Sequence, residues 1–295
     1  MKKVEKVLAF DMGGTKIASA FVEISGSGYK LSGYKRNLTP KKQADIVDTF
    51  VGLIGEYKSK YDFDRIGVAV AGQVNKEGDT IIYTPNIAMA RNFKLGKMIE
   101  RKTGFPVALR NDVRCFAFGE DRFGKFKGHE NAVYIAVGTG LGGAIKINGE
   151  FFFGKDNIAG EFGHMIIEVG GEQCACGRKG CWERYVAGPG VEKLYEKAYG
   201  REKCAKDIVY DAVRGVEKDK AIMLKASYYF AVGFSNVVNV LDPEIAIIGG
   251  SMVKEKRLLR LAMPLIKKEV LPSAKKVKVF NASLDDKAFL LGAAL

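Results

Sequence analysis

An α/β protein with a duplicated architecture is predicted from three features of this 295-residue sequence. Apolar strand-like stretches alternate with segments of helical periodicity along the chain. A strand–turn–strand pattern near the start is tipped with Gly13-Gly14-Thr15. The same layout returns at Gly138-Thr139-Gly140, about 125 residues later, and such repetition indicates two similar domains. Each domain would give one glycine-rich loop to grip a phosphate chain.

The first glycine turn lies in residues 7–24, which read VLAFDMGGTKIASAFVEI. Gly13 and Gly14 let backbone amides approach a phosphate without an intervening Cβ. Thr15 and Lys16 add a hydroxyl and a cation, and Asp11 at the strand tip can hold Mg²⁺ directly or through water. For one such turn alone, an ordinary hairpin is the better interpretation.

The second glycine turn contains G-x-G-x-x-G at Gly138, Gly140 and Gly143. A dinucleotide-binding turn needs a helix next, but the following residues are strand-like and end at the hairpin signal Asn148-Gly149. No G-K-[ST] follows, so a P-loop is excluded as well. The repeated hairpin therefore favours phosphate binding by both loops.

Between and after these loops, strands and helices alternate. Apolar strands are expected at residues 66–71, 80–83, 106–110, 245–248 and 277–280. Helices are expected at residues 44–57, 93–103, 115–123, 191–198, 204–214, 219–241, 256–268 and 285–295. The strand at 245–248 is closed by Gly249-Gly250-Ser251, a turn suited to lie against an adenosine moiety.

Two polar residues follow strands where α/β enzymes place their chemistry. Asp112 comes after the strand at 106–110 and opens the next helix, so it is either a helix N-cap or a general base at the sheet edge. Asn86 follows Pro85 in a rigid loop, where its amide binds a hydroxyl or caps a turn.

A structural zinc site is predicted from His164, Cys174, Cys176 and Cys181. Three thiolates and one imidazole fill the tetrahedral shell of Zn²⁺ and leave no position for water. The alternative interpretation is a set of buried or disulfide-forming cysteines, although C-x-C-x₄-C in a glycine-rich stretch is a poor disulfide pattern. Cys115 and Cys204 are expected to pack as small hydrophobic residues.

Two glutamates flank this metal pattern. Glu161 precedes His164 by three residues, and Glu183 follows Cys181 by two. A metal that fixes those ligands also fixes the two carboxylates, which are good acceptors for vicinal sugar hydroxyls. Each glutamate taken alone is best interpreted as a solvated surface charge.

Composition limits the classes of protein that fit. Hydrophobic residues make up 47% and charged residues 27%, as in soluble globular proteins. No run of eighteen apolar residues predicts a membrane span, and no secretory signal is evident, so with free-thiol ligands we expect a cytoplasmic protein. The net charge of +13 would also suit a protein that binds nucleic acid. The lysines are spread along the chain without interleaved aromatics, so no nucleic-acid partner is expected; a basic surface also attracts an anionic nucleotide.

Taken together, the motifs resemble the ROK family of sugar kinases, within the hexokinase–actin superfamily. The resemblance covers nearly the whole chain. It rests on Asp11-Met12-Gly13-Gly14-Thr15-Lys16, Gly138-Thr139-Gly140-Leu141-Gly142-Gly143, Glu161-Phe162-Gly163-His164, the C-x-C-G-x₂-G-C knuckle with Glu183, and Ile248-Gly249-Gly250.

The resemblance implies two ribonuclease-H-like α/β domains with mixed five-stranded sheets and a cleft between them. The small domain would comprise residues 1–114 plus 283–295, and the large domain residues 115–282 with the zinc knuckle. Homodimers or homotetramers are expected.

The implied reaction is ATP-dependent phosphorylation of a hexose, with glucose at its 6-hydroxyl expected first. Asp112 would be the catalytic base, with Mg²⁺ and the glycine loops sharing the phosphate charge. By resemblance, the residues lining the sugar pocket are Asn86, Asn111, Asp112, Glu161, His164 and Glu183. The nucleotide side comprises Asp11, Gly13, Gly14, Thr15, Lys16, Gly138, Thr139, Gly140, Gly249 and Gly250. The family's zinc ligands match His164, Cys174, Cys176 and Cys181.

There are two departures from the family pattern, and the first lies near the implied sugar site, so it affects the identity of the sugar more than the type of reaction. The loop after Asn86 reads I-A-M-A-R-N-F where many relatives have Pro and Trp, and the turn at 70–73 lacks a frequent Pro. N-acetylmannosamine, N-acetylglucosamine, fructose and allose therefore stay open as substrates. A rival class is a sugar-responsive regulator without kinase activity. Such relatives carry a helix-turn-helix before the first loop, and here Asp11 is only ten residues from the start.

Overall fold

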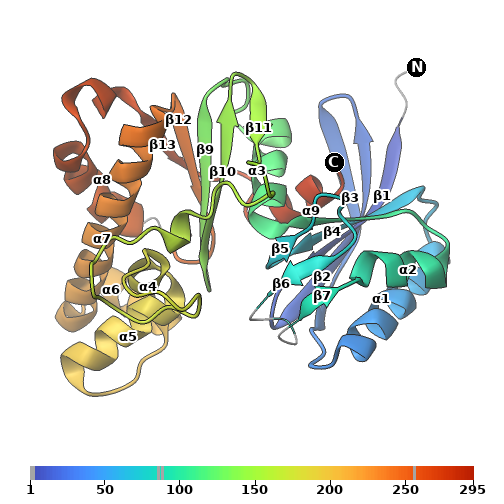
Figure 1. Cartoon of the computed structure of the whole chain (residues 1–295), viewed down its shortest axis with the longest axis horizontal. Coiled ribbons are helices and arrows are strands. Elements are labelled where there is room, and N and C mark those ends of the chain that lie inside the picture. The colour runs from blue at the N-terminus through green and yellow to red at the C-terminus, as the bar shows by residue number, and fades with distance from the viewer. Residues whose placement is uncertain (1–3, 85–86, 88–89, 255–256) are drawn as a thin grey trace. The chain divides into compact units, whose positions relative to one another are not determined.

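Two five-stranded sheets organise the computed structural model, which describes residues 4–84, 87, 90–254 and 257–295 (Figure 1). Each sheet is the centre of one compact unit. Unit 1 comprises Met1–Gly128, Phe153–Ile158 and Ser283–Leu295, and unit 2 comprises His129–Phe152 and Ala159–Ala282.

The sheet of unit 1 has the order β3-β2-β1-β4-β8. Strands β1 (Glu5–Met12), β2 (Lys16–Ser25) and β3 (Gly28–Leu38) form an antiparallel meander. Strands β4 (Arg65–Val70) and β8 (Val107–Asn111) run parallel to β1. A small antiparallel sheet follows β4, with β5 (Gln73–Val74), β6 (Ile81–Tyr83) and β7 (Arg91–Phe93).

Alternating residues of β1 fill two cores, one on each face of this sheet. Leu8 and Phe10 pack in one core with residues of α1 (Gln43–Lys58) and α2 (Leu95–Thr103). Val7 and Ala9 pack in the other with residues of α3 (Asp112–Phe123) and α9 (Lys287–Ala293). The sheet is thus covered on both faces, and its strand ends are left to carry the loops.

Unit 2 repeats the same sheet plan, with the order β11-β10-β9-β12-β13. Strands β9 (Ala132–Val137), β10 (Leu141–Ile147) and β11 (Glu150–Phe152) are antiparallel, and β12 (Ile245–Gly249) and β13 (Lys278–Asn281) continue parallel to β9. The predicted duplication and the mixed five-stranded sheets are confirmed by this match of order and direction.

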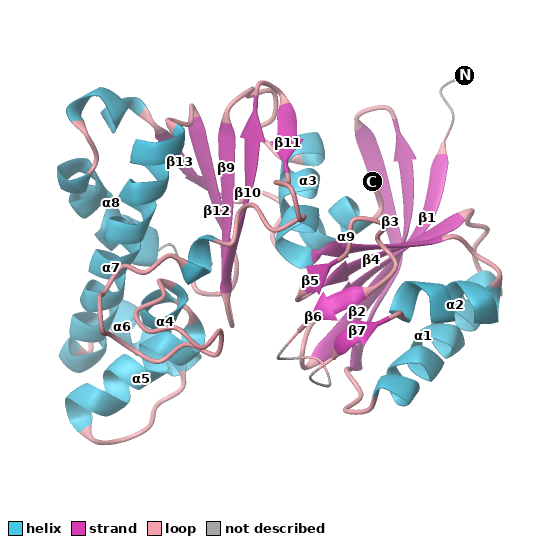
Figure 2. Cartoon of the chain, in the orientation of Figure 1, coloured by secondary structure: helices cyan, strands magenta, loops and turns pink. Residues whose placement is uncertain are grey.

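The helices of unit 2 gather on one side of its sheet (Figure 2). They are α4 (Glu183–Val186), α5 (Gly188–Tyr199), α6 (Ala205–Arg214), α7 (Glu217–Leu241) and α8 (Arg257–Glu269), with 3₁₀ turns at Phe162–His164 and Pro272–Lys276. Among the described helices, α7 alone has the length and apolar composition of a membrane-crossing helix. Phe230 and Phe234 on α7 are fully buried in the core of unit 2, as expected of a core helix in a globular domain.

The unit boundary differs from the one expected after residue 114. That position falls inside α3, which packs closely on α9 through two glycines. A Cβ on Gly119 would lie 2.3 Å from the Ala288 carbonyl oxygen, and one on Gly292 would lie 1.7 Å from that of Cys115. Because this close packing keeps α3 whole with unit 1, the structure divides at Gly128 instead.

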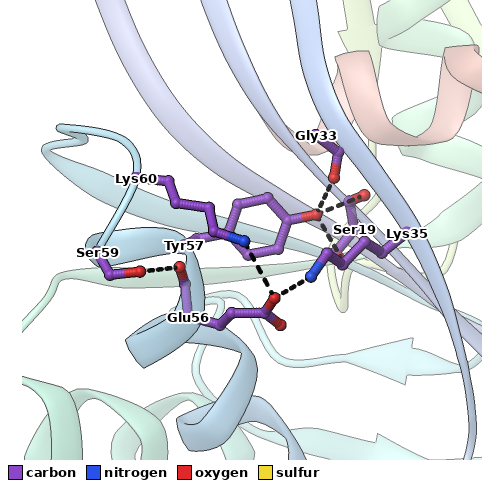
Figure 3. Close-up of polar contacts among 7 residues, drawn as sticks. All are labelled: Ser19, Gly33, Lys35, Glu56, Tyr57, Ser59 and Lys60. Atoms are coloured by element: carbon purple, nitrogen blue, oxygen red, sulfur yellow. Dashed lines mark hydrogen bonds and ion pairs between the residues drawn. The ribbon is translucent and has the colours of Figure 1, made fainter.

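A tyrosine on α1 braces the outer strands of unit 1 (Figure 3). The Tyr57 hydroxyl lies 3.0 Å from Ser19 Oγ and donates to the backbone oxygens of Ser19 and Gly33. The β2–β3 register shifts just after Ser19. The tyrosine therefore ties β2 to β3 at the point where their ladder is irregular.

Two details of the sequence prediction were wrong. Strand β3 was not anticipated, because its residues GYKLSGYKRNL are mostly exposed and carry no apolar alternation. Cys115 is fully buried as expected, but Cys204 is exposed at the N-cap of α6.

Candidate active site

The first glycine loop connects β1 to β2 in unit 1. Its turn is closed by the Gly13 amide, which donates to the Lys16 oxygen at 3.0 Å. Thr39, just beyond β3, braces the loop from behind: its hydroxyl donates to the Gly13 oxygen at 2.7 Å and its amide to the Thr15 oxygen at 3.0 Å. Thr15 and Lys16 stay exposed, so a hydroxyl and a cation remain accessible at the tip.

Asp11 lies one residue before the end of β1, in an electrostatically unfavourable place. Burial and the nearby Asp286 raise the pKa of its carboxyl to about 6, although Lys16 and Arg36 oppose the change. A carboxylate that is desolvated and faces another acid would be stabilised by a cation. These residues therefore fit a divalent cation held against the first glycine loop.

Asn111 and Asp112 lie at the same sheet edge as Asp11. The register places Met12 beside Val70 and Val70 beside Asn111, so β1, β4 and β8 end in one row. The Asn111 side chain caps α3 by accepting the Arg114 amide at 3.1 Å, and it donates to the Gly72 oxygen at 3.1 Å. Unit 1 thus brings its glycine loop and the candidate base to one edge.

The Asp112 carboxylate is oriented by its neighbours. Its Oδ1 accepts the Val113 amide at 2.9 Å and the Asn111 side-chain amide at 3.2 Å. Asp112 is the first residue of α3, where the helix dipole also favours a negative charge. The N-cap role goes to Asn111, which leaves Asp112 partly exposed and fixed in direction.

The second glycine loop connects β9 to β10 in unit 2 and is held at three points. The Gly138 amide donates to the Gly140 oxygen at 2.8 Å, and the Gly138 oxygen accepts the Gly188 amide at 2.8 Å. The Leu141 amide donates to Glu183 Oε2 at 2.8 Å. Thr139 at the tip is exposed.

The late glycine turn packs against this second loop. Gly250 has a φ of 95°, and a Cβ there would lie 2.3 Å from the Val137 oxygen. The Met252 amide donates to that same oxygen at 3.0 Å. Unit 2 therefore brings Gly138–Gly140 and Gly249–Gly250 together, as a nucleotide site built from both would require.

The predicted metal ligands converge. The ligand atoms of His164, Cys174, Cys176 and Cys181 all lie within 4.8 Å of one another. Cys176 Sγ is 3.6 Å from Cys181 Sγ, and Cys174 Sγ is 3.8 Å from His164 Nδ1. Tetrahedral zinc with Zn–S bonds of about 2.3 Å needs S–S separations of roughly 3.8 Å, far longer than the ~2.05 Å of a disulfide. The four residues fit a closed tetrahedral site.

The thiols of this cluster have unequal acidity. Burial raises the pKa of Cys181 to about 12. For Cys176 the backbone amide and guanidinium of Arg178 and the neighbouring thiols outweigh the effect of burial and lower the pKa to about 6. A thiolate at Cys176 is the form in which sulfur binds a metal.

The two flanking glutamates have different surroundings. Glu161 Oε2 lies 3.9 Å from His164 Nε2, whereas the other ring nitrogen, Nδ1, lies near Cys174. A carboxylate near the second ring nitrogen is a common way to orient a metal-bound imidazole. Glu183 instead accepts from the second glycine loop. Asn86 lies outside the described residues.

Three contacts were not found by sequence reasoning. They are the support of the first loop by Thr39, the bond between Glu183 and Leu141, and the anchoring of residues 153–158 by Arg114. The buried Arg114 guanidinium donates to the Asn157 oxygen at 2.8 Å and stacks on Phe153. Each joins residues far apart in sequence, and no local pattern marks such pairs.

Comparisons with known proteins identify the family and the fold. The ROK family model matches residues 7–295. The N-acetyl-D-glucosamine kinase of Vibrio cholerae is 30% identical over 298 residues, with 97% of each chain covered. The glucokinase of Streptomyces coelicolor is 31% identical over 307 residues, with 97% of this chain and 96% of that one covered. The crystal structure of a ROK family glucokinase from Streptomyces griseus in complex with glucose and AMPPNP matches with a TM-score of 0.87 at 28% identity, covering 98% of both chains.

Proposed function

This chain belongs to the ROK family, and we propose that it is a hexose kinase that transfers the γ-phosphoryl group of ATP to the 6-hydroxyl of glucose. The observation that carries the proposal is the repeated sheet plan, with one glycine loop in each unit and Asp112 at the strand edge that carries the first loop. Its sugar-kinase relatives match along nearly the whole chain.

Asp112 is proposed to be the general base. Two donors already fix its Oδ1, and a carboxylate has further acceptor sites for a sugar hydroxyl. Accepting that proton makes the hydroxyl oxygen a better nucleophile and aims it at the γ-phosphorus. Asn111, whose amide is tied to Gly72 and Asp112, is proposed to hold a neighbouring hydroxyl.

The phosphate chain is proposed to lie against the backbone amides of both glycine loops. Thr15, Lys16 and Thr139 are exposed at the loop tips and can donate to phosphate oxygens. Asp11 would hold Mg²⁺, which when bound neutralises part of the phosphate charge. The raised pKa of Asp11 supports this role, because a cation would relieve its repulsion from Asp286.

The Cys₃His cluster is proposed to hold a structural Zn²⁺. With four protein ligands it has no open position for substrate. Its contribution would be to fix the segment from Glu161 to Glu183, which presents Glu161, His164 and Glu183 to sugar hydroxyls. Asn86 is proposed to complete the sugar-binding set.

N-acetylglucosamine is a second candidate substrate, favoured by the Vibrio relative of that activity at 30% identity. The choice depends on the shape of the pocket around the sugar C2 substituent. N-acetylmannosamine, fructose and allose are further acceptors to be compared. We also propose a cytoplasmic location, on the basis of the free thiols, and a homodimer or homotetramer.

A hexose panel tests the proposal. The purified protein, Mg²⁺ and ATP are assayed by coupled detection of ADP with each of these sugars, and with other phosphoryl donors. We expect glucose to give the highest kcat/KM. A kcat/KM for N-acetylglucosamine at least tenfold above that for glucose would favour the second candidate. No sugar-dependent ADP release with any hexose would overturn the kinase proposal and favour a sugar-responsive regulator.

A further inference from the structure

A charged side chain, Glu183, binds the second glycine loop from the end of the knuckle segment, residues 161–183. We propose that Glu183 is a positioning residue for this loop, which makes nucleotide affinity depend on a residue next to the Cys₃His cluster. The inference rests on the proposed function in one respect, that the loop binds nucleotide phosphate.

The contact lies at the base of the loop. Leu141 is the first residue of β10, directly after the Gly138–Gly140 turn, and its amide donates to Glu183 Oε2 at 2.8 Å. A Cβ on Gly140 would lie 2.7 Å from the same oxygen. An added side chain at Gly140 would therefore push the carboxylate away from its present position, so glycine there favours the contact between Glu183 and Leu141.

The backbone of Glu183 is fixed on its N-terminal side. Trp182 is fully buried, its ring lies beside Phe230, and its amide donates to the Met165 oxygen at 2.8 Å. Cys181 before it is a buried member of the Cys₃His cluster. Glu183 itself opens α4. The carboxylate is thus held by the knuckle and a packed indole, and it in turn holds the loop.

Nucleotide binding gains from this arrangement because the loop is ordered before the ligand arrives. A hydrogen bond to an ionised acceptor is stronger than a neutral one. Without it, the ordering of the loop would have to occur at binding and would weaken affinity. A carboxylate has a second oxygen, so the bond to Leu141 leaves Glu183 able to accept a sugar hydroxyl as well. The two ligands would then share one side chain.

Three variants separate positioning from sugar binding. Glu183→Ala removes the acceptor. Glu183→Gln keeps a carbonyl oxygen for the Leu141 amide but loses the charge. Gly140→Ala leaves Glu183 in the chain and shifts its carboxylate. The Gly140 backbone lies outside the left-handed region, so alanine causes no backbone strain there. Apart from the two chain neighbours, Glu183 is the one described residue within 4 Å of the added carbon. The matched control is Glu172→Gln, a knuckle carboxylate bound to Lys197 and away from the loop.

The measurements are made on the protein without sugar. They are hydrogen exchange of the amides in residues 138–142, the Kd for AMPPNP with Mg²⁺ by calorimetry, and zinc content. For Glu183→Ala and Gly140→Ala we expect faster exchange at Leu141 and a Kd raised about tenfold or more. Glu183→Gln keeps a neutral acceptor, so it should raise the Kd less than Glu183→Ala does, by about threefold. Zinc content and the Glu172→Gln control should be unchanged.

The inference would be overturned if Glu183→Ala kept the parental amide exchange in the loop and the parental Kd for nucleotide but had a raised KM for sugar. Glu183 would then be a sugar ligand alone. If Glu183→Ala lost zinc or unfolded, amide exchange at Leu141 in Gly140→Ala would decide, because Gly140 is itself a proposed nucleotide contact and its nucleotide Kd would change for either reason. Faster exchange at Leu141 in a protein that phosphorylates no hexose would support the positioning role and contradict only the proposed function.

Discussion

At neutral pH the charged carboxylate of Asp11 lowers the free energy of unfolding. Its folded-state pKa is about 6, above the usual value of 3.8, because burial and Asp286 disfavour the charged form. Between these values the folded state binds more protons than the unfolded chain, so the free energy of unfolding falls as pH rises through this window. The loss is nearly complete by about pH 7. The residue proposed to hold the cation is here kept at the expense of stability.

Asp11→Asn should therefore stabilise the ligand-free protein by on the order of 3 kcal/mol at pH 8, and by only about a third as much at pH 4.5. Comparing variant and parent at each pH cancels the other titrating groups. Thermal or urea unfolding at both pH values measures the difference. Equal stability of the two proteins at pH 8 would show that charged Asp11 does not destabilise the folded protein. Separately, phosphoryl transfer by the variant should be strongly reduced.

At the level of secondary structure, the position of Asp112 depends on the crossing of α3 and α9. Gly292 lets the two helices approach, because an added Cβ would lie 1.7 Å from the Cys115 oxygen. That oxygen belongs to backbone and cannot move aside as a flexible side chain would. The crossing also explains why the C-terminal helix belongs to unit 1.

Gly292→Ala should destabilise unit 1 by about 1–3 kcal/mol, as overpacking does. Gly52→Ala is the control: Gly52 lies within α1 with no atom within 4 Å of an added Cβ in the described structure, so alanine there should stabilise by about 0.5–1 kcal/mol. Chemical denaturation of both variants measures the contrast. An unchanged midpoint for Gly292→Ala would contradict the packing argument.

The knuckle is the element that we propose to order the acids of unit 2. Cys176→Ala should reduce zinc from about one ion per chain to almost none, since three ligands bind far more weakly than four. Amide exchange between residues 161 and 183 should increase. Cys204→Ala, which removes an exposed cysteine outside the cluster, should keep its zinc. A full zinc content in purified Cys176→Ala, measured by elemental analysis, would be inconsistent with the ligand set.

The sequence predicts the elements of this site better than their contacts. Gly13-Gly14 and Gly138–Gly140 mark their hairpins because glycine turns between alternating strands are a local signal. The Cys and His spacing likewise predicts the cluster. The bond from Glu183 to Leu141 joins residues 42 apart and has no local signal. The exposed edge strand β3 was missed because few of its residues pack in a core.

At the scale of the whole chain, the two units repeat one sheet plan and contribute different chemistry. Unit 1 carries the candidate base and the residues that fit a divalent cation. Unit 2 carries the Cys₃His cluster and the late glycine turn. The net charge of the whole chain, +13, is suited to attract an anionic nucleotide. Neither unit alone contains all the residues that the proposed reaction uses.

The most direct test of the account is identification of the product. Protein, Mg²⁺, ATP and glucose are followed by ³¹P NMR, with Asp112→Ala in parallel. We predict that glucose 6-phosphate and ADP accumulate in equal amounts. Asp112→Ala should bind glucose almost as the parent does but turn over roughly 10²–10⁴ times more slowly. Absence of any sugar phosphate with the parent, or near-parental turnover by Asp112→Ala, would contradict the central claim.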